Sequence, residues 1–333
     1  MPLIDPSSYK APFLLGNAHI QTILPSYLRH EEDIAYDREP FATPDDDTIQ
    51  LDWSRVGSDK LLVINHGLCG HTHRHYVLSL VKAFNAAGWD CLAWNYRGTG
   101  ASDIQYKQLK FTTNNSTDEL GWIIDYAIEK YHYNSIALSG YSMGGNLAAL
   151  YLSREADHVP PQVIGGALFC AAIDLHGCTL SLDNPFNRIY TKHFLKKLIN
   201  LARAKHEQFP DKVDLSNIDK IQTFHDYDNR YTAPLIGFKD ADDYYTTASA
   251  SRYLEKLKLP LLMVNPKNDP FLGGDCYPVE FAKKSPYLYL EIPESGGHCG
   301  FITTGRDKLW WPAQRALDFL NPLVKLPIFR PSA

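Results

Sequence analysis

The 333-residue chain has 33 basic and 38 acidic side chains, a net charge of −5 at neutral pH, and 44% of its residues are hydrophobic. This composition is typical of a globular protein with a sizeable core, and it lacks the basic field that nucleic-acid binding requires. No apolar run approaches the roughly 20 residues that span a bilayer, so we expect no integral membrane segment.

The N-terminus and the cysteines favour a cytoplasmic location. Residues 1–6 lack the basic-then-apolar layout of a signal peptide. Six cysteines are scattered along the chain without C-x-x-C spacing: Cys69, Cys91, Cys170, Cys178, Cys276 and Cys299. In a chain of this length we expect reduced thiols rather than a framework of disulfides.

The first half of the chain alternates between predicted strands and helices. Residues 34–55 read as an antiparallel pair with its turn at residues 45–47. Buried strands are predicted at 61–65, 91–94, 135–139 and 166–170, and helices at 75–87, 117–131 and 146–152. This order predicts an α/β fold with a mostly parallel central sheet and helices on both faces.

The alternation stops near Asp174 and resumes near Leu259. Between them, apolar residues recur at helical spacing: Phe194, Leu195, Leu198, Ile199 and Ala202. We favour an amphipathic helix packed on the body. The alternatives are a lid over an active site and a helix that touches a membrane surface.

A second helix over about residues 242–257 returns the chain to the sheet. Strands at 261–264 and 287–292 and a closing helix at 310–320 complete the predicted fold. We therefore expect one domain over residues 1–333, with a helical cap insertion at about 174–258.

The sequence Gly-Tyr-Ser-Met-Gly-Gly at residues 140–145 lies between a predicted strand and a predicted helix. A G-x-S-x-G in this context is typical of a nucleophile elbow, where a strained turn exposes the serine hydroxyl. The helix N-terminus favours negative charge that develops there. Ser142 is therefore the candidate nucleophile.

Two further residues complete a candidate catalytic triad in the chain order serine, acid, histidine. Asp269 follows the strand at 261–264, and His298 follows the strand at 287–292 within a glycine-rich loop. Open α/β sheets place their chemistry beyond the carboxyl ends of such strands. Other carboxylates compete with Asp269 for the role of the acid: Asp240, Asp242, Asp243 and Asp275. Asp269 follows its strand most directly, so we predict that it is the acid.

An oxyanion hole is expected from two backbone N–H groups. One belongs to Met143, directly after the nucleophile. The other comes from the loop after the strand at 61–65, and Leu68 is our choice. We expect no cofactor.

A histidine cluster could suggest a metal site, and it comprises His66, His71, His73 and His75. It lacks acidic or cysteine ligands at the usual spacing, so we predict no metal. Cys69 and Cys299 are expected near the site, as small buried residues rather than reactive thiols.

The chain resembles the YheT-like esterases of the α/β-hydrolase superfamily, which are related to eukaryotic ABHD-type esterases. The matching segments are residues 17–25, 65–68, 95–98, 140–146, 243–245, 268–271 and 297–301. The resemblance implies a serine carboxylic-ester hydrolase with Ser142, Asp269 and His298 in the triad positions. It also implies short or medium acyl esters as substrates. Arg97, within one of these segments, is expected to be a structural ion-pair partner.

Together these features predict a carboxylesterase-type serine hydrolase that forms an acyl-enzyme with a small-molecule ester. The alternative is an acyltransferase that passes the acyl group to an alcohol or thiol. A third hypothesis is a non-catalytic binding protein on the same fold. The ordered serine, aspartate and histidine argue against it, because a scaffold does not need them.

Overall fold

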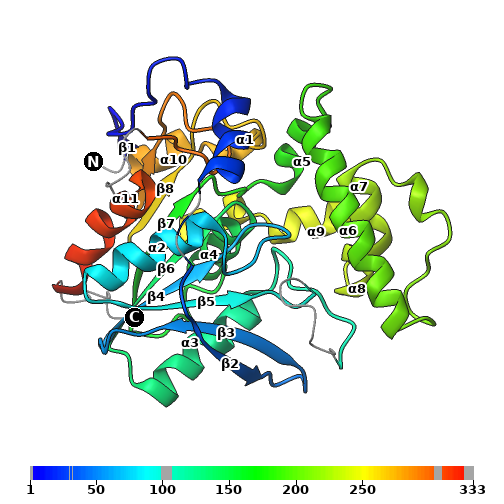
Figure 1. Ribbon diagram of the computed structural model, residues 1–333, viewed down its shortest axis with the longest axis horizontal. Helices are drawn as coiled ribbons and strands as arrows, with labels where there is room; N and C mark the ends of the chain where they lie inside the picture. The colour runs from blue at the N-terminus through cyan, green and yellow to red at the C-terminus, as the bar shows by residue number, and fades with distance from the viewer. Residues whose placement is uncertain (1–2, 30, 32, 99–106, 304–309, 326–333) are drawn as a thin grey trace.

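The computed structural model describes residues 3–29, 31, 33–98, 107–303 and 310–325 (Figure 1). Within these residues nine strands form one sheet in the order β1-β9-β8-β7-β6-β4-β5-β3-β2. The strands are β1 (Leu3–Ile4), β2 (Asp37–Ala42), β3 (Thr48–Ser54), β4 (Lys60–Asn65), β5 (Asp90–Asn95), β6 (Ser135–Tyr141), β7 (Val163–Phe169), β8 (Leu261–Val264) and β9 (Leu288–Glu291).

The sheet is parallel except at one edge. There β2 pairs antiparallel with β3, and β3 pairs antiparallel with β5. The central strands are apolar on both faces, and every residue of β5 and β7 is buried. Such strands must be covered by helices on both sides. The predicted α/β fold with a mostly parallel sheet is confirmed.

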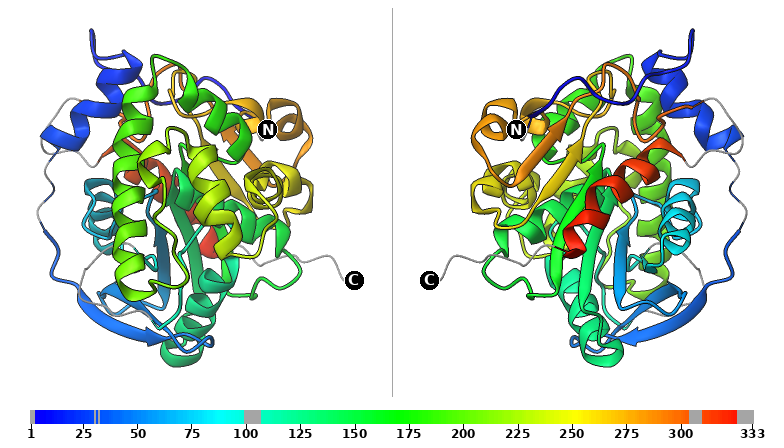
Figure 2. Two further views of the ribbon diagram at one scale, coloured as in Figure 1. Left: turned by 90° about the vertical axis from the view of Figure 1, so that its right-hand side faces the viewer. Right: turned by 90° about the vertical axis from the view of Figure 1, so that its left-hand side faces the viewer.

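Helices cover both faces of the sheet. On one face, Leu62 and Ile64 of β4 pack in a core with α2 (His75–Ala86) and α11 (Trp311–Leu320). On the other face, Leu61 and Val63 pack with α3 (Thr117–Tyr131) and α4 (Met143–Arg154). Figure 2 shows α11 lying across its face of the sheet. The alternating direction of side chains along a strand thus builds two cores.

The segment between β7 and β8 contains only helices and loops. Its helices are α5 (Leu175–Asp183), α6 (Arg188–Gln208), η1 (Ile218–Lys220), α7 (Phe224–Tyr227), the π-helix η2 (Asp228–Thr232), α8 (Ala233–Leu235), α9 (Ala241–Ala248) and η3 (Ala250–Lys256). They form a group beside the sheet, on the right in Figure 1. The predicted amphipathic run lies within α6.

The single helix expected over residues 242–257 is wrong. The chain forms α9 and then the 3-10 helix η3, with a break at Ser249. The backbone N–H of Ala250 donates to Asn146 Oδ1, and that of Ser251 donates to the Ile173 carbonyl. These donors are engaged outside the helix, so they cannot continue the α-helical ladder.

Two shorter helices complete the described elements: α1 (Ala18–Leu28) near the N-terminus and α10 (Val279–Lys284) between β8 and β9, with the 3-10 turns η4 (Gly274–Cys276) and η5 (Asn321–Lys325). The side chain of Asn17 caps α1 by accepting from the N–H groups of His19 and Ile20.

Across the described residues, no helix combines the length and apolar character needed to cross a membrane.

Candidate active site

Ser142 occupies a sharp turn between β6 and α4. Its backbone angles are φ 55° and ψ −119°, which a non-glycine residue rarely adopts. Neighbouring glycines make the turn sterically feasible. A Cβ on Gly140 would lie 2.3 Å from the Gly144 carbonyl oxygen, and a Cβ on Gly144 would lie 2.3 Å from the Asn65 carbonyl oxygen. The strain and the close approach fit the predicted elbow.

His298 and Asp269 are in direct contact. Nδ1 of His298 lies 2.8 Å and 3.0 Å from the two carboxylate oxygens of Asp269. The Asp269 side chain is fully covered and that of His298 is 8% exposed. The Phe271 ring stacks on the imidazole with centroids 3.9 Å apart, and its N–H donates to Asp269 Oδ1. Packing and hydrogen bonds therefore hold the pair in one orientation.

The competing carboxylates lie elsewhere. Asp275 is exposed on η4, and its N–H donates to Asp174 Oδ2. Asp240 caps α9, and Asp242 faces His225 from the surface of that helix. Among the described residues, Asp269 is the carboxylate that His298 binds.

Ser142 shares its surroundings with His298 but makes no hydrogen bond to it in the described part of the chain. Both residues line the same two cavities, together with Leu68, Phe194 and Phe271. Such bonds are often long in a ligand-free site and tighten when substrate binds. The structure thus brings all three predicted residues to one place and joins two of them directly.

Of the two residues predicted to donate N–H groups, Met143 directly follows Ser142, and Leu68 lines both cavities with it. Met143 is the first residue of α4, where helix N–H groups have no intrahelical acceptor. Leu68 lies in the loop after β4, in which a Cβ on Gly67 would sit 3.4 Å from the Ser142 Cβ. Within the described residues, neither N–H donates to another protein atom. Both N–H groups are therefore without a partner among the described residues, as the predicted oxyanion hole requires.

Helix α1 supports the His298 loop, which the sequence reasoning did not foresee. Thr22 Oγ1 accepts from the His298 N–H at 2.9 Å, and Gln21 Oε1 accepts from the Ile302 N–H at 2.8 Å. A Cβ on Gly300 would lie 1.7 Å from the Gln21 carbonyl oxygen, so only glycine fits there. Residues 17–25 and 297–301 are both among the segments that resemble the family, but residue spacing does not indicate that these two segments are in contact.

Charge around His298 is arranged to favour its protonated form. Burial has the largest single effect and disfavours the imidazolium, but the charges and hydrogen bonds of Asp269 and Cys299 together outweigh it and raise the pKa of His298. The Cys299 thiol adds to this effect. Burial opposes ionisation of Cys299, yet its contacts with Cys170 and His298 lower its pKa to about 6. By contrast, burial raises the pKa of Cys69 to about 11. The thiolate form is therefore favoured at Cys299 and disfavoured at Cys69.

The histidine cluster does not converge on a shared point. His73 Nδ1 lies 2.6 Å from Asp33, and His66 Nδ1 lies 2.8 Å from the Gly67 carbonyl oxygen. Within the described residues, the three side chains with ligand atoms close enough to hold a metal are Cys170, His298 and Cys299. Because His298 Nδ1 is bound to Asp269, this group overlaps the candidate triad.

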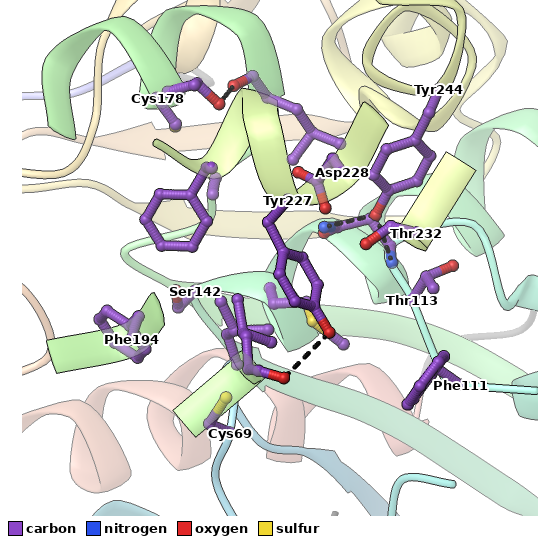
Figure 3. Close-up of a pocket in the computed structure, with 18 of the residues that line it drawn as sticks. Cys69, Phe111, Thr113, Ser142, Cys178, Phe194, Tyr227, Asp228, Thr232 and Tyr244 are labelled. Atoms are coloured by element: carbon purple, nitrogen blue, oxygen red, sulfur yellow. Dashed lines mark hydrogen bonds between the residues drawn. The ribbon is translucent and has the colours of Figure 1, made fainter. Parts of the chain in front are cut away.

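Two cavities meet at Ser142. The inner cavity, of about 150 Å³, runs beneath the β7–β8 segment and is lined mainly by apolar side chains such as Phe111, Leu198 and Phe224 (Figure 3). The outer cavity, of about 300 Å³, opens between α1 and α6. A hole of about 150 Å³ holds a group as large as benzene. The serine therefore lies where a buried group and an exposed group could meet.

Comparisons with known proteins agree with this geometry. Residues 60–304 match the family model described as alpha/beta hydrolase fold. The putative esterase YheT of Escherichia coli is 27% identical over 317 residues, which cover 93% of this chain and 92% of that protein. The human phospholipase ABHD3 is 27% identical over 292 residues, which cover 85% of this chain and 70% of that protein.

A solved structure of the Pyrococcus furiosus esterase Pf2001 superimposes with a TM-score of 0.56 at 18% identity. The match covers 90% of this chain and 93% of that one. At this identity the likeness shows the fold alone.

Proposed function

The chain belongs to the alpha/beta hydrolase fold family, and from this premise we propose that it is a serine carboxylic-ester hydrolase. The observation that carries the proposal is the hydrogen-bonded pair of Asp269 and His298. His298 lines both cavities together with Ser142, whose backbone is strained. The relatives named above, an esterase and a phospholipase, support the same class of reaction.

The proposed reaction has two acyl-transfer steps. Ser142 Oγ attacks the ester carbonyl while His298 Nε2 takes its proton, and the N–H groups of Met143 and Leu68 bind the oxyanion. His298 then protonates the leaving alcohol as the carbonyl–oxygen bond breaks. Water, deprotonated by His298, attacks the acyl-enzyme and releases the acid, and the proton returns to Ser142. Asp269 orients the imidazole throughout.

The cavities support short to medium acyl groups as substrates. The inner cavity has room for roughly six non-hydrogen atoms, by comparison with the benzene-sized hole of similar volume. We place the acyl group there, because its lining is mainly apolar. The alcohol leaves by the outer cavity, which is wider and opens to the surface.

The segment at residues 174–258 is proposed as a cap of the same domain. It supplies half of the residues that line the inner cavity, among them Leu175, Phe194 and Tyr227. This contribution supports a role in shaping the acyl pocket rather than in chemistry.

A fluorophosphonate probe and p-nitrophenyl butyrate test the proposal together. We expect the probe to label the folded protein at Ser142, and Ser142→Ala to abolish both labelling and turnover. Ser216→Ala, at an exposed serine away from the cavities, serves as the matched control. A folded protein that takes no label and cleaves no ester would refute the proposal. Formation of a new ester with added alcohol, in place of free acid, would redirect it to the acyltransferase.

A further inference from the structure

The motif Asp243-Tyr244-Tyr245 has no part in the proposed chemistry, yet both tyrosines line the inner cavity. They lie on α9, and in Figure 3 Tyr244 appears with Asp228 and Thr232 on the side of the cavity away from Ser142. This end of the cavity differs from the apolar remainder, because several of its side chains are polar.

Asp228 is the charged group at this end. It is the first residue of the π-helix η2, a rare geometry that is frequent at functional sites. Its carboxylate accepts from the Tyr245 hydroxyl at 2.7 Å and from the Thr232 side chain. Asp228 lines the cavity, and the residue as a whole is partly exposed. It therefore presents an acceptor to whatever enters.

Asp228 makes no ion pair among the described residues, and the basic side chain that acts on it through its charge is His225. The nearest candidate, His225, is directed elsewhere: its Nε2 lies 3.4 Å from Asp242 and its Nδ1 lies 3.0 Å from Asn229. Burial raises the pKa of Asp228 to about 6. A desolvated carboxylate of this kind gains free energy when a donor reaches it.

A hydrogen-bond network fixes the other polar groups around Asp228. The Tyr244 hydroxyl accepts from both the backbone N–H and the side-chain amide of Asn114, at 3.3 Å and 3.2 Å. Asn114 Oδ1 in turn accepts from Asn146 Nδ2 at 3.0 Å. Asn146 lies on α4, four residues after Ser142. The polar end is thus built onto the same helix that carries the nucleophile.

We propose that this polar end, formed by Asp228, Thr232, Tyr244 and Tyr245, is a subsite for a hydrogen-bond donor at the far end of the acyl group. The donor is a hydroxyl or an ammonium, since a carboxylate can only accept. This proposal rests on the proposed function, because the subsite would bind the far end of the acyl group that is attached to Ser142. It makes ω-hydroxyacyl or ω-aminoacyl esters the favoured substrates.

The test compares methyl esters that differ only at the end of the chain: hexanoate, 6-hydroxyhexanoate and 6-aminohexanoate, with the matching eight-carbon series. Hydrolysis is followed by titration of the released acid. We expect kcat/KM for at least one polar ester to exceed that of the plain ester of equal length by about tenfold or more, because a site built for a donor rejects an analogue that lacks it. The hydroxyl and ammonium arms identify which donor is read.

Asp228→Asn should lower this ratio at least tenfold, with most of the loss on the polar ester. Asp242→Asn, at a carboxylate on α9 that is 64% exposed, should leave the ratio unchanged. Thermal unfolding checks that each variant is folded. If Asp228→Asn does not fold, the ratio of polar to plain ester hydrolysis in the wild-type protein decides whether the subsite exists.

Equal loss on plain and polar esters would assign Asp228 a structural role and overturn the subsite. So would a wild-type enzyme that cleaves plain esters with no preference for a polar end. A protein that cleaves none of the esters and takes no fluorophosphonate label would instead refute the proposed function, and the subsite with it.

Discussion

Asp269 and Asp275 are six residues apart, but their surroundings differ completely. Asp269 is covered and bound to His298, whereas Asp275 is exposed and its backbone bonds to Asp174. The order of strands and residues indicated Asp269, but the sequence could not exclude Asp275 because both follow β8. The two aspartates differ in burial because of the path of the loop after β8. In this loop the backbone N–H of Phe271 donates to the Asp269 carboxylate.

Asp269→Asn is expected to lower kcat/KM by roughly 10³–10⁴-fold, because an amide favours the wrong tautomer of the histidine. Asp275→Asn should change it less than about threefold. Both variants are compared by ester hydrolysis at one pH, with the circular dichroism spectrum as a check on folding. The reverse pattern would move the acid to Asp275.

The raised pKa of His298 sets the pH dependence. Catalysis requires the neutral imidazole, so activity falls as pH drops through that pKa. Since the pKa is raised, we expect the acid limb of the kcat/KM profile to lie above the ~6.5 of an ordinary histidine. A profile with its half-maximal point at or below that value would contradict the assigned electrostatics.

A substitution at Cys299 measures how much this thiol contributes to the raised pKa of His298, separately from Asp269. Its thiolate favours the imidazolium of His298, so Cys299→Ala should move the acid limb to lower pH. Cys69→Ala is the matched control, because burial raises the pKa of that thiol and keeps it neutral. An acid limb that stays in place in Cys299→Ala would show that Asp269 alone raises the pKa.

At the scale of elements, α1 links the N-terminal segment to the loop of His298. Thr22 accepts from the His298 backbone, and Gln21 packs where Gly297 and Gly300 leave room. This contact joins residues nearly 280 positions apart in the chain. Helix α1 therefore supports the histidine from outside the sheet.

Thr22→Val removes this acceptor while keeping the shape of the side chain. We expect kcat to fall about tenfold through loss of orientation, with a stability loss of about 1 kcal/mol. Ser26→Ala is the control on the same helix. Ser26 also lines the outer cavity, but among the described residues its hydroxyl bonds to the Ile23 carbonyl and not to the His298 loop. A variant with unchanged kcat would show that the loop is held without Thr22.

The sequence predicted those elements whose own residues determine them. Strand β7 is free of polar side chains, the middle of β5 is apolar at residues 91–94, and α3 matches the predicted residues 117–131. The break at Ser249 could not be predicted, because it depends on acceptors from Asn146 and Ile173. The polar end of the cavity was missed for the same reason: Asp228 and Tyr245 come together only in three dimensions.

Across the whole molecule, Arg97 joins parts of the fold that surround the site. It lies past the end of β5, where its guanidinium binds Glu119 on α3 and Asp45 in the turn between β2 and β3, at 2.6 Å and 2.9 Å. Neither Arg97 nor Glu119 is exposed. The ion pairs predicted for Arg97 are confirmed. They tie the antiparallel edge of the sheet to a helix on its face.

Arg97→Met should lower the free energy of unfolding by about 3–5 kcal/mol, because it leaves the Glu119 carboxylate buried without its partner. Arg203→Ala is the matched control. Its partner Asp219 is 83% exposed, so that variant should lose less than about 1 kcal/mol. Urea unfolding at neutral pH measures both. In the double variant Arg97→Met, Glu119→Leu, stability should partly return, since no uncompensated charge remains on α3. A double variant as unstable as Arg97→Met would show that Glu119 is not the cause, and would assign the loss to packing around the guanidinium or to the buried Asp47 carboxylate that Arg97 also binds.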